Sequence, residues 1–216
     1  MSAANERPAL TRERVICAAM ELADRRGIEA LTIRALATEL QTKPMSLYHH
    51  VAGKEAIVNG LVDQVFSEIE LPPQDLPWRD AIRHRYLSAR RVLRQHPWAP
   101  PLMESRTSPG SATLTHHDAV LACLRRGGLD WSLVAHAYAL LDAFVYGFAL
   151  QEASLPFDGN AEVAELADQM ASAFPEGAYS TLVEFTTQHV LQPGYDFADS
   201  FEFGLDMLLN GIEAAR

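Results

Sequence analysis

Apolar residues recur along this chain at intervals of three and four positions, the spacing of amphipathic helices, and no segment shows the alternation of a strand. Proline and glycine separate these repeats and indicate where helices end. The pattern predicts an all-α protein. Its helices are expected near residues 11–26, 33–40, 53–70, 78–96, 98–106, 111–127, 131–154, 161–174, 179–191 and 196–214, with one more short helix beginning at Pro44.

The segment from Leu31 to Lys54 has the most specific pattern. Only Gln41–Lys43 separate its two short helical repeats, so the connection is a tight turn. Pro44 suits the first turn of the second helix, and Leu47 and Val51 repeat one helical turn apart as its buried side. With the supporting helix upstream, this order predicts a three-helix head with a helix-turn-helix, a unit that places its second helix in the DNA major groove.

The exposed side of that second helix, with its flanks, carries the donors and rings expected at a DNA surface. Thr32 is suited to cap the first short helix. Lys54 adds a cation beside the N-terminal amides of the next helix, and the two together favour a phosphate. The expected DNA-binding residues are Thr32, Arg34, Lys43, Pro44, Met45, Ser46, Tyr48, His49, His50 and Lys54. For Tyr48 the alternative is packing against the first helix of the head.

Two motifs, GIEALT at residues 27–32 and LYHHV at residues 47–51 followed by Lys54, resemble the TetR family of bacterial transcriptional regulators, and especially its tetracycline-repressor branch. The resemblance implies a DNA-binding domain of residues 1–54 and an effector-binding and dimerisation domain of residues 55–216. It also implies that Tyr48 and Lys54 face phosphates. The chain departs from the family at Gln41, where glycine is usual and where the turn can require a backbone angle that glycine adopts readily.

Charge is divided unevenly between these two parts. The formal net charge is -10, yet residues 1–54 hold 8 Lys and Arg against 6 Asp and Glu, whereas residues 55–216 hold 10 against 22. A polyanion repels an acidic body, so DNA contact is expected at the head alone. Most of the carboxylates need no further role than solubility.

The sequence does not indicate a membrane protein, a secreted protein or an enzyme. No apolar run approaches the roughly 20 residues of a membrane span, and Met1–Leu10 lacks the apolar centre of a signal peptide, so a cytoplasmic protein is expected. Cys17 and Cys123 have no metal-ligand spacing and are expected to be reduced and buried. No catalytic motif or phosphate-binding loop occurs, so neither enzymatic activity nor a cofactor is expected.

Two helices of the body favour a homodimer. The helix at 131–154 is apolar on nearly all sides, so it needs two covers, its own core and a partner subunit in a four-helix interface. The helix at 196–214 carries a wide apolar stripe. The expected interface residues are Val134, Tyr138, Leu141, Val145, Phe201, Leu205, Leu208 and Ile212. The alternative is that both helices lie in the core of a monomer.

A small-molecule site is expected among the helices of the body, where aromatic side chains are interspersed with a few polar ones. The expected ligand-binding residues are Phe66, His84, Tyr86, Trp98, Met103, Glu104, Asp142, Phe144 and Tyr146. A packed helical core has the same composition, so for each residue both interpretations stay open. The ligand would be a small hydrophobic effector.

A metal site is not expected. In the resemblance to the tetracycline repressors, Glu104 stands about where a histidine would bind the drug's magnesium, and Gln151 stands where a second acidic group is expected, so that site is not carried over. His116 and His117 are adjacent and point about 100° apart on a helix, which places them on an exposed helical turn rather than on one metal ion.

These observations predict a one-component DNA-binding regulator, a repressor that a small molecule releases from a palindromic double-stranded operator. The alternative is a regulator of the same fold, or an activator, whose body binds a protein partner and no small-molecule effector.

Overall fold

The computed structural model describes residues 9–155 and 178–216, and every regular element in these ranges is helical, as the sequence predicts. The expected helix at 161–174 lies outside the described residues. The elements in chain order are α1 (Arg12–Arg26), η1 (Ile28–Ala30), α2 (Ile33–Glu39), α3 (Pro44–Leu47), α4 (Lys54–Glu68), α5 (Trp78–Gln95), α6 (Pro100–Met103), α7 (Ser111–Arg126), α8 (Trp131–Ser154), α10 (Ser180–Phe185), η2 (Thr186–Val190) and α11 (Asp199–Ala214).

The head is built from α1, α2 and α3, and local signals set the ends of its helices. Thr11 and Thr32 cap α1 and α2, because their hydroxyls accept from the backbone N–H groups of Arg14 (3.2 Å) and Ala35 (3.1 Å). Gly27 ends α1 with a positive φ of 78°. The buried faces of the three helices share one core, which contains Val15, Ala19, Leu22, Leu31, Leu36 and Leu47.

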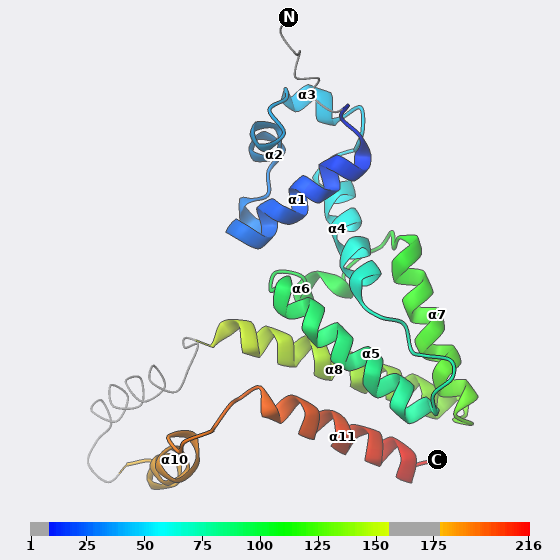
Figure 1. Cartoon of the computed structure of the whole chain (residues 1–216), viewed down its shortest axis with the longest axis vertical. Helices are drawn as coiled ribbons and strands as arrows, with labels where there is room; N and C mark the ends of the chain where they lie inside the picture. The colour runs from blue at the N-terminus through cyan, green and yellow to red at the C-terminus, as the bar shows by residue number, and fades with distance from the viewer. Residues whose placement is uncertain (1–8, 156–177) are drawn as a thin grey trace, which may run out of the picture.

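The helix α4 runs from the head into the body (Figure 1). Gly60 allows its close approach to α1, since a Cβ there would lie 2.6 Å from Cδ1 of Ile16. Further along, the Oδ1 atom of Asp63 accepts from the backbone N–H and the hydroxyl of Thr113 on α7, at 2.8 and 3.0 Å. One helix is therefore fixed to the head at one end and to the body at the other.

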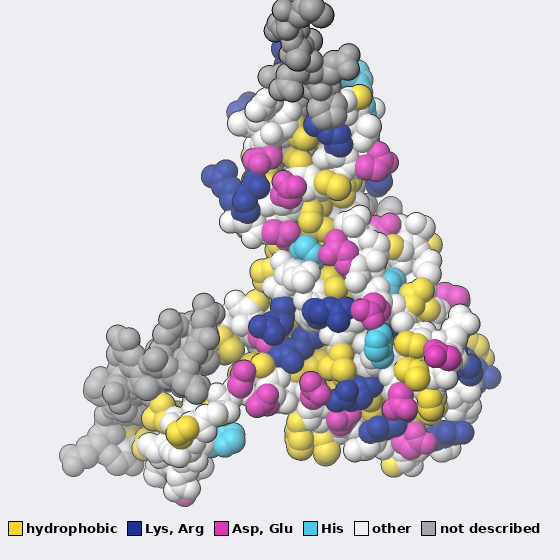
Figure 2. Space-filling model, viewed as in Figure 1, with side chains coloured by type: hydrophobic (Ala, Val, Ile, Leu, Met, Phe, Trp, Pro, Cys, Tyr) yellow, Lys and Arg dark blue, Asp and Glu magenta, His cyan; other side chains and the backbone are white. Residues whose placement is uncertain are grey.

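In the body, α5, α8 and α11 lie side by side, and α7 packs against α4 and α5 (Figure 1). Arg83 joins α5 to α11 through Glu202 (2.7 Å) and Asp206 (2.9 Å). Figure 2 shows basic and acidic side chains interleaved over the visible face of the body. Among the described helices, only α8 has the length and hydropathy of a membrane span, and one side of it is buried in this body.

The residues expected at a dimer interface are mostly covered by the chain itself, so that prediction is corrected. Val134, Leu141, Val145, Phe201, Leu205 and Ile212 are buried in the single subunit, and Tyr138 and Leu208 are half-buried. The cause is the close packing of α11 on α8, where Phe201 stacks on Phe144 at 5.2 Å and a Cβ at Gly204 would lie 2.7 Å from the Phe144 ring. Their apolar stripes face each other and form core.

Smaller corrections concern helix ends and one cysteine. The helix expected at 98–106 is limited to α6, and residues 179–191 form α10 followed by the π-helical turn η2. The last helix begins at Asp199 rather than near 196. Cys123 is buried as expected, but Cys17 is exposed because it falls on the solvent side of α1.

Candidate functional site

The turn between α2 and α3 places Gln41 in the left-handed region, with φ at 50°. The backbone N–H groups of Gln41 and Thr42 donate to the carbonyls of Thr38 (3.0 Å) and Ala37 (2.8 Å). These hydrogen bonds end α2 and bring Lys43 to the N-cap of α3. The turn therefore forms even though Gln41, and not the family's usual glycine, adopts the left-handed conformation, which is strained for a residue with a side chain.

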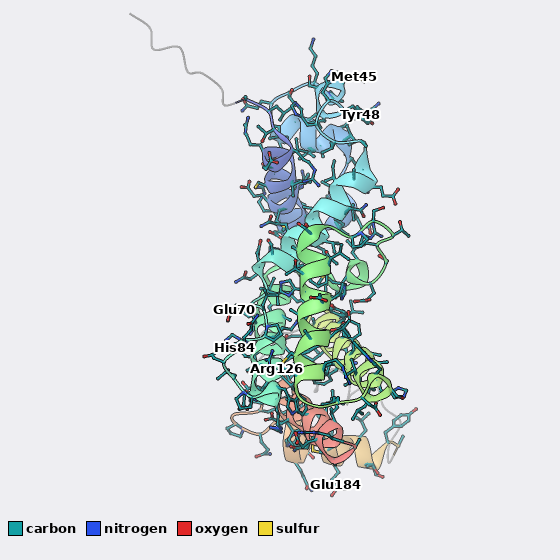
Figure 3. The ribbon with its side chains drawn as sticks, turned by 90° about the vertical axis from the view of Figure 1, so that its right-hand side faces the viewer. Met45, Tyr48, Glu70, His84, Arg126 and Glu184 are labelled. Carbon is teal, nitrogen blue, oxygen red and sulfur yellow. The ribbon has the colours of Figure 1, made fainter. Side chains whose placement is uncertain are left out.

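The helix α3 lies at the tip of the molecule, at the end of the head remote from the body (Figures 1 and 3). Its Leu47 is buried, whereas Met45 is 71% exposed and Tyr48 is 49% exposed. Thr32, Arg34, Lys43, Pro44, Met45, Tyr48, His49 and Lys54 are exposed, and Ser46 and His50 are half-buried. An exposed apolar side chain beside rings and cations fits a surface that contacts thymine methyls and base edges.

Lys54 is the first residue of α4 and is exposed. Gly53 precedes it with φ at 147°, and no described side chain caps this end of α4. The first N–H groups of a helix need partners from outside the helix. A phosphate can accept from these N–H groups and from the Lys54 ammonium at once.

A buried histidine joins the head to the body. His96, directly after α5, has Nδ1 2.7 Å from Oδ1 of Asp24 on α1 and Nε2 3.0 Å from Oε2 of Glu68 on α4. The indole of Trp98 donates to the same Asp24 oxygen at 2.7 Å. Burial disfavours the imidazolium, but the hydrogen bonds to the two carboxylates outweigh burial and raise the pKa of His96. In its charged form both ring nitrogens donate, so His96 ties α1 to α4.

A second group of polar side chains, the buried polar cluster, lies inside the body and consists of Arg85, Tyr86, Asp142 and Tyr146. Arg85 is 2% exposed, and its Nη1 lies 3.5 Å from Oδ1 of Asp142. Tyr86 donates its hydroxyl to the same oxygen at 2.7 Å. Burial raises the pKa of both Tyr86 and Tyr146, so both phenols stay protonated at neutral pH.

Aromatic rings from α4, α7 and α8 flank this cluster. The Phe66 ring lies 5.7 Å from the His116 ring and 5.5 Å from the His117 ring. His117 is hydrogen-bonded through Nδ1 to the hydroxyl of Tyr138. Burial, assisted by the charge of Arg85, lowers the pKa of His116 to about 4, so this imidazole is neutral at pH 7.

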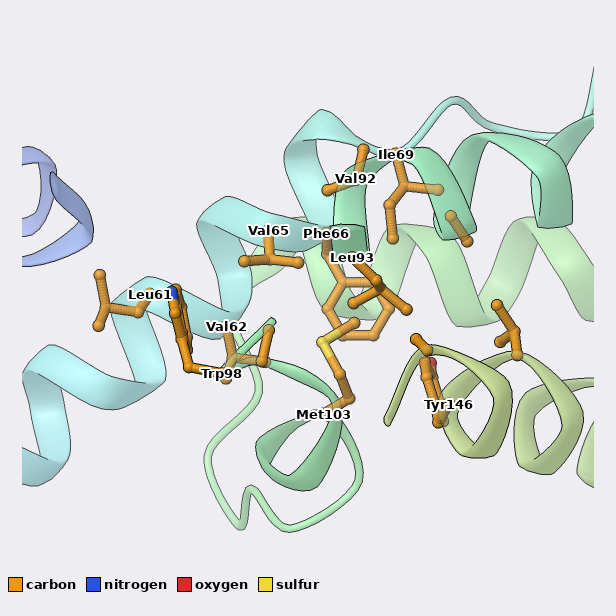
Figure 4. Close-up of a cluster of buried hydrophobic side chains, with 14 of the residues drawn as sticks. Leu61, Val62, Val65, Phe66, Ile69, Val92, Leu93, Trp98, Met103 and Tyr146 are labelled. Carbon is orange, nitrogen blue, oxygen red and sulfur yellow. The ribbon is translucent and has the colours of Figure 1, made fainter. Parts of the chain in front are cut away.

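Six of the nine residues expected to bind a ligand lie in the buried polar cluster or beside it, and Figure 4 shows three of them where α4, α6 and α8 meet. These six are Phe66, Tyr86, Met103, Glu104, Asp142 and Tyr146. The other three lie elsewhere. His84 faces solvent and pairs with Glu70 at 3.1 Å, Trp98 belongs to the junction with the head, and Phe144 stacks on Phe201.

The sequence interpretation did not name Arg85, and it assigned Tyr138 to the dimer interface and His116 and His117 to an exposed helical turn. The other arginines of α5 reach the surface, so a charged residue on this helix is expected to be exposed. Arg85 nevertheless repeats at helical spacing with the buried Ile82 and Ala89. The exposed placement expected for His116 is wrong, because it repeats at helical spacing with the buried Thr113 and Val120. Among the described residues, no group of three His, Cys, Asp or Glu side chains is placed to hold a metal ion.

Known proteins share both parts of this arrangement. The family described as "Bacterial regulatory proteins, tetR family" matches residues 15–61, and "Tetracyclin repressor-like, C-terminal domain" matches residues 71–216. An HTH-type transcriptional regulator of Saccharopolyspora erythraea is 38% identical over 142 residues, an alignment that covers 65% of this chain and 60% of that relative. The HTH-type transcriptional repressor DrrR1 of Streptomyces coeruleorubidus is 31% identical over 220 residues, covering 96% of this chain and 78% of that protein.

A solved structure agrees over nearly the whole chain. The TetR family protein ActR of Streptomyces coelicolor, in complex with actinorhodin, superposes with a TM-score of 0.80 and 28% identity, covering 96% of this chain and 97% of that chain. The first family match spans most of the helix-turn-helix head, and the second spans nearly all of the helical body. Such a head makes the protein a DNA-binding transcriptional regulator rather than an enzyme. The chain therefore belongs to the TetR family of bacterial regulatory proteins.

Proposed function

We propose that this regulator is a repressor that binds an operator through α3 and leaves it when a small molecule binds at the buried polar cluster. The observation that carries the proposal is that Arg85 and Asp142 form a charged pair inside the body, 3.5 Å apart, and that Nε of Arg85 and Oδ2 of Asp142 are buried with no partner at hydrogen-bond geometry in the described part of the chain. Such groups are rare in folded proteins and indicate a ligand or ordered water. The relative DrrR1 is named a repressor, and ActR was solved with actinorhodin, which supports both halves of the proposal.

The route from this cluster to DNA runs through α4. That helix contacts α7, which carries His116 and His117, and it also contacts α1 of the head. A ligand that fits better when α7 or α8 is displaced would favour a second position of α4. The two heads of a dimer would then no longer be spaced about 34–36 Å apart for successive major grooves.

The proposed repressor is a cytoplasmic homodimer, and its dimer surface lies on the exposed sides of α8 and α11. Leu140 is 52% exposed, Phe203 is 71% exposed and Met207 is 58% exposed. Phe203 and Met207 lie one turn apart on α11, and Leu140 is exposed on the neighbouring helix α8. Also on α8, Gly147 has open space around it, where a partner helix could approach. Two such pairs of helices would make a four-helix interface across a two-fold axis.

Footprinting on DNA upstream of the protein's own gene and of its neighbours tests the proposal. We expect a protected, near-palindromic site of two half-sites. A panel of hydrophobic compounds is then screened by thermal shift, because a ligand that binds the native state raises Tm. A compound that raises Tm should also release the operator. Operator binding with no thermal shift across the panel would favour the alternative, a regulator whose body binds a protein partner.

A further inference from the structure

The first turn of α7 receives its cap from another helix. Gly110 is the N-cap residue of α7 and has no side chain to accept from the open N–H groups of that turn. Asp63 of α4 takes this role, because its Oδ1 accepts from the backbone N–H of Thr113 at 2.8 Å and from the Thr113 hydroxyl at 3.0 Å. Its negative charge also lies at the positive end of the α7 dipole. A capping side chain normally belongs to the helix that it caps, so this cap joins two helices.

Gly110 is needed here for space and not for its backbone. Its φ of -83° and ψ of -177° are open to residues with a side chain. A Cβ at Gly110 would, however, collide with the carboxylate of Asp63. A residue that could cap α7 locally, such as serine, would therefore displace Asp63. The same glycine removes the local cap and makes room for the one from α4.

Asp63 lies between the contact of α4 with the head and its contact with the aromatic rings of the body. One turn before Asp63, Gly60 lies against Ile16 of α1. One turn after it, the Phe66 ring lies 5.7 Å from the ring of His116 on α7. Apolar contacts have little directionality, whereas hydrogen bonds weaken steeply when their distance or angle changes. The hydrogen bonds of Asp63 therefore define the place of α4 along α7 more sharply than the packing around them.

We propose that Asp63 is a positioning residue that fixes α4 along α7 and thereby couples the body to the DNA-binding head. A displacement of the first turn of α7 moves Thr113, and the two hydrogen bonds carry Asp63 and α4 with it. Because α4 also contacts α1, the head follows. This inference rests on the proposed function, in which the signal from the body reaches DNA through α4.

Three variants separate coupling from simple helix capping. Asp63→Ala removes both the cap and the link between the helices. Asp63→Asn keeps an acceptor oxygen for Thr113 and should behave like the wild type. The double variant Asp63→Ala with Gly110→Ser gives α7 a cap of its own, because the missing carboxylate leaves room for the serine side chain, but it does not restore the link. The matched control is Asp118→Ala, which removes an exposed carboxylate from α7 itself.

Pulsed electron paramagnetic resonance between two spin labels measures the position of the head relative to α7. One label is attached to Cys17, which is exposed on α1, and the other to Thr115→Cys at an exposed position of α7, while Cys123 is buried. Labelled chains are diluted with unlabelled chains, so that only distances within one subunit are observed.

We expect a narrow distance distribution in the wild-type background, in Asp63→Asn and in Asp118→Ala. The distribution should be broad in Asp63→Ala and in the double variant, whereas a thermal melt should show a Tm that is lowered in Asp63→Ala and restored in the double variant. A narrow distribution in the double variant would overturn the inference, because Asp63 would then act only as a cap. An unchanged distribution in Asp63→Ala would overturn it as well. If Asp63→Ala does not fold, the double variant carries the comparison.

Operator binding distinguishes this inference from the proposed function. Moving the half-sites of the footprinted operator a single base pair closer or further apart should weaken binding of the wild type. The double variant should lose at least about fivefold of this preference, the lower end of the usual coupling between sites. A wild type that binds no paired half-sites would contradict the proposed repressor, and the distance measurement, which needs neither DNA nor an effector, would still decide on Asp63. An equal spacing preference in the wild type and the double variant would contradict the coupling role and leave the proposed function intact.

Discussion

At the tip of the head, an exposed side chain can contact the phosphates or the base edges, and the two roles have different consequences. Lys54, beside the open N–H groups of α4, is placed for a phosphate, whereas Lys43 at the N-cap of α3 is placed for base edges. We predict that Lys54→Ala weakens binding to operator and to random DNA about equally and lowers the slope of log affinity against log salt by about one unit. Fluorescence anisotropy over a salt series measures both.

Lys43→Ala is the control for this assignment, since it should weaken binding to the operator more than binding to random DNA. If Lys54→Ala changed the sequence preference while leaving the salt slope intact, the assigned roles would be wrong.

Gln41 shows how one residue stores strain in the turn of the head. A left-handed backbone destabilises a non-glycine residue by roughly 1–2 kcal/mol. Glycine avoids this strain, but it loses more conformational entropy on folding, which offsets part of the gain. Gln41→Gly should therefore raise the free energy of unfolding by about 0.5–1 kcal/mol in urea denaturation. Gln41→Ala keeps the strain and should change little, and lower stability of Gln41→Gly would mean that the Gln41 side chain contributes contacts of its own.

At the scale of elements, His96 holds α1 of the head against α4. Its pKa is raised in the folded protein, so the stabilisation is fully present below the unfolded pKa of about 6.5 and is lost as pH rises through the raised folded value. We predict that the free energy of unfolding falls as the pH rises from 6 to 9, and that His96→Gln removes most of this fall. Urea denaturation at a series of pH values measures it.

His84 provides the control at this scale, because it is a histidine on α5 with one carboxylate partner and an exposed side chain. His84→Gln should leave the pH dependence almost unchanged, since exposed ion pairs contribute little. An unaltered pH profile in His96→Gln would show that other groups dominate it.

For the whole molecule, two neighbouring positions on α11 separate the core of one subunit from the proposed interface. Leu205 is fully buried, whereas Phe203 is 71% exposed. Leu205→Glu would bury an unpaired charge at several kcal/mol and should unfold the subunit. Phe203→Glu should leave circular dichroism unchanged, yield a monomer in light scattering and lower operator affinity by orders of magnitude, because a single head loses the effective concentration of a linked pair. A Phe203→Glu protein that stays dimeric with full affinity would place the interface elsewhere.

The sequence by itself determined that the described chain is helical, where most helices lie, and that a tight turn joins α2 to α3. Threonine caps, Pro44 and the three- and four-residue spacing act on neighbouring positions, so their effect is readable from the chain alone. Six of the residues expected to bind a ligand lie in or beside the buried polar cluster, and they were chosen by type, as aromatic and polar residues on helices of the body.

Only the tertiary structure decided which side of each helix is covered and which charges become internal. From the sequence, the apolar stripes of α8 and α11 could face a partner subunit or each other. In the structure they face each other, because Gly204 lets the two helices approach closely. The same holds for Arg85 inside the body and for His96 between Asp24 and Glu68. Burial depends on contacts between helices far apart in the chain, and periodicity shows that a helix has an apolar side but does not show what covers it.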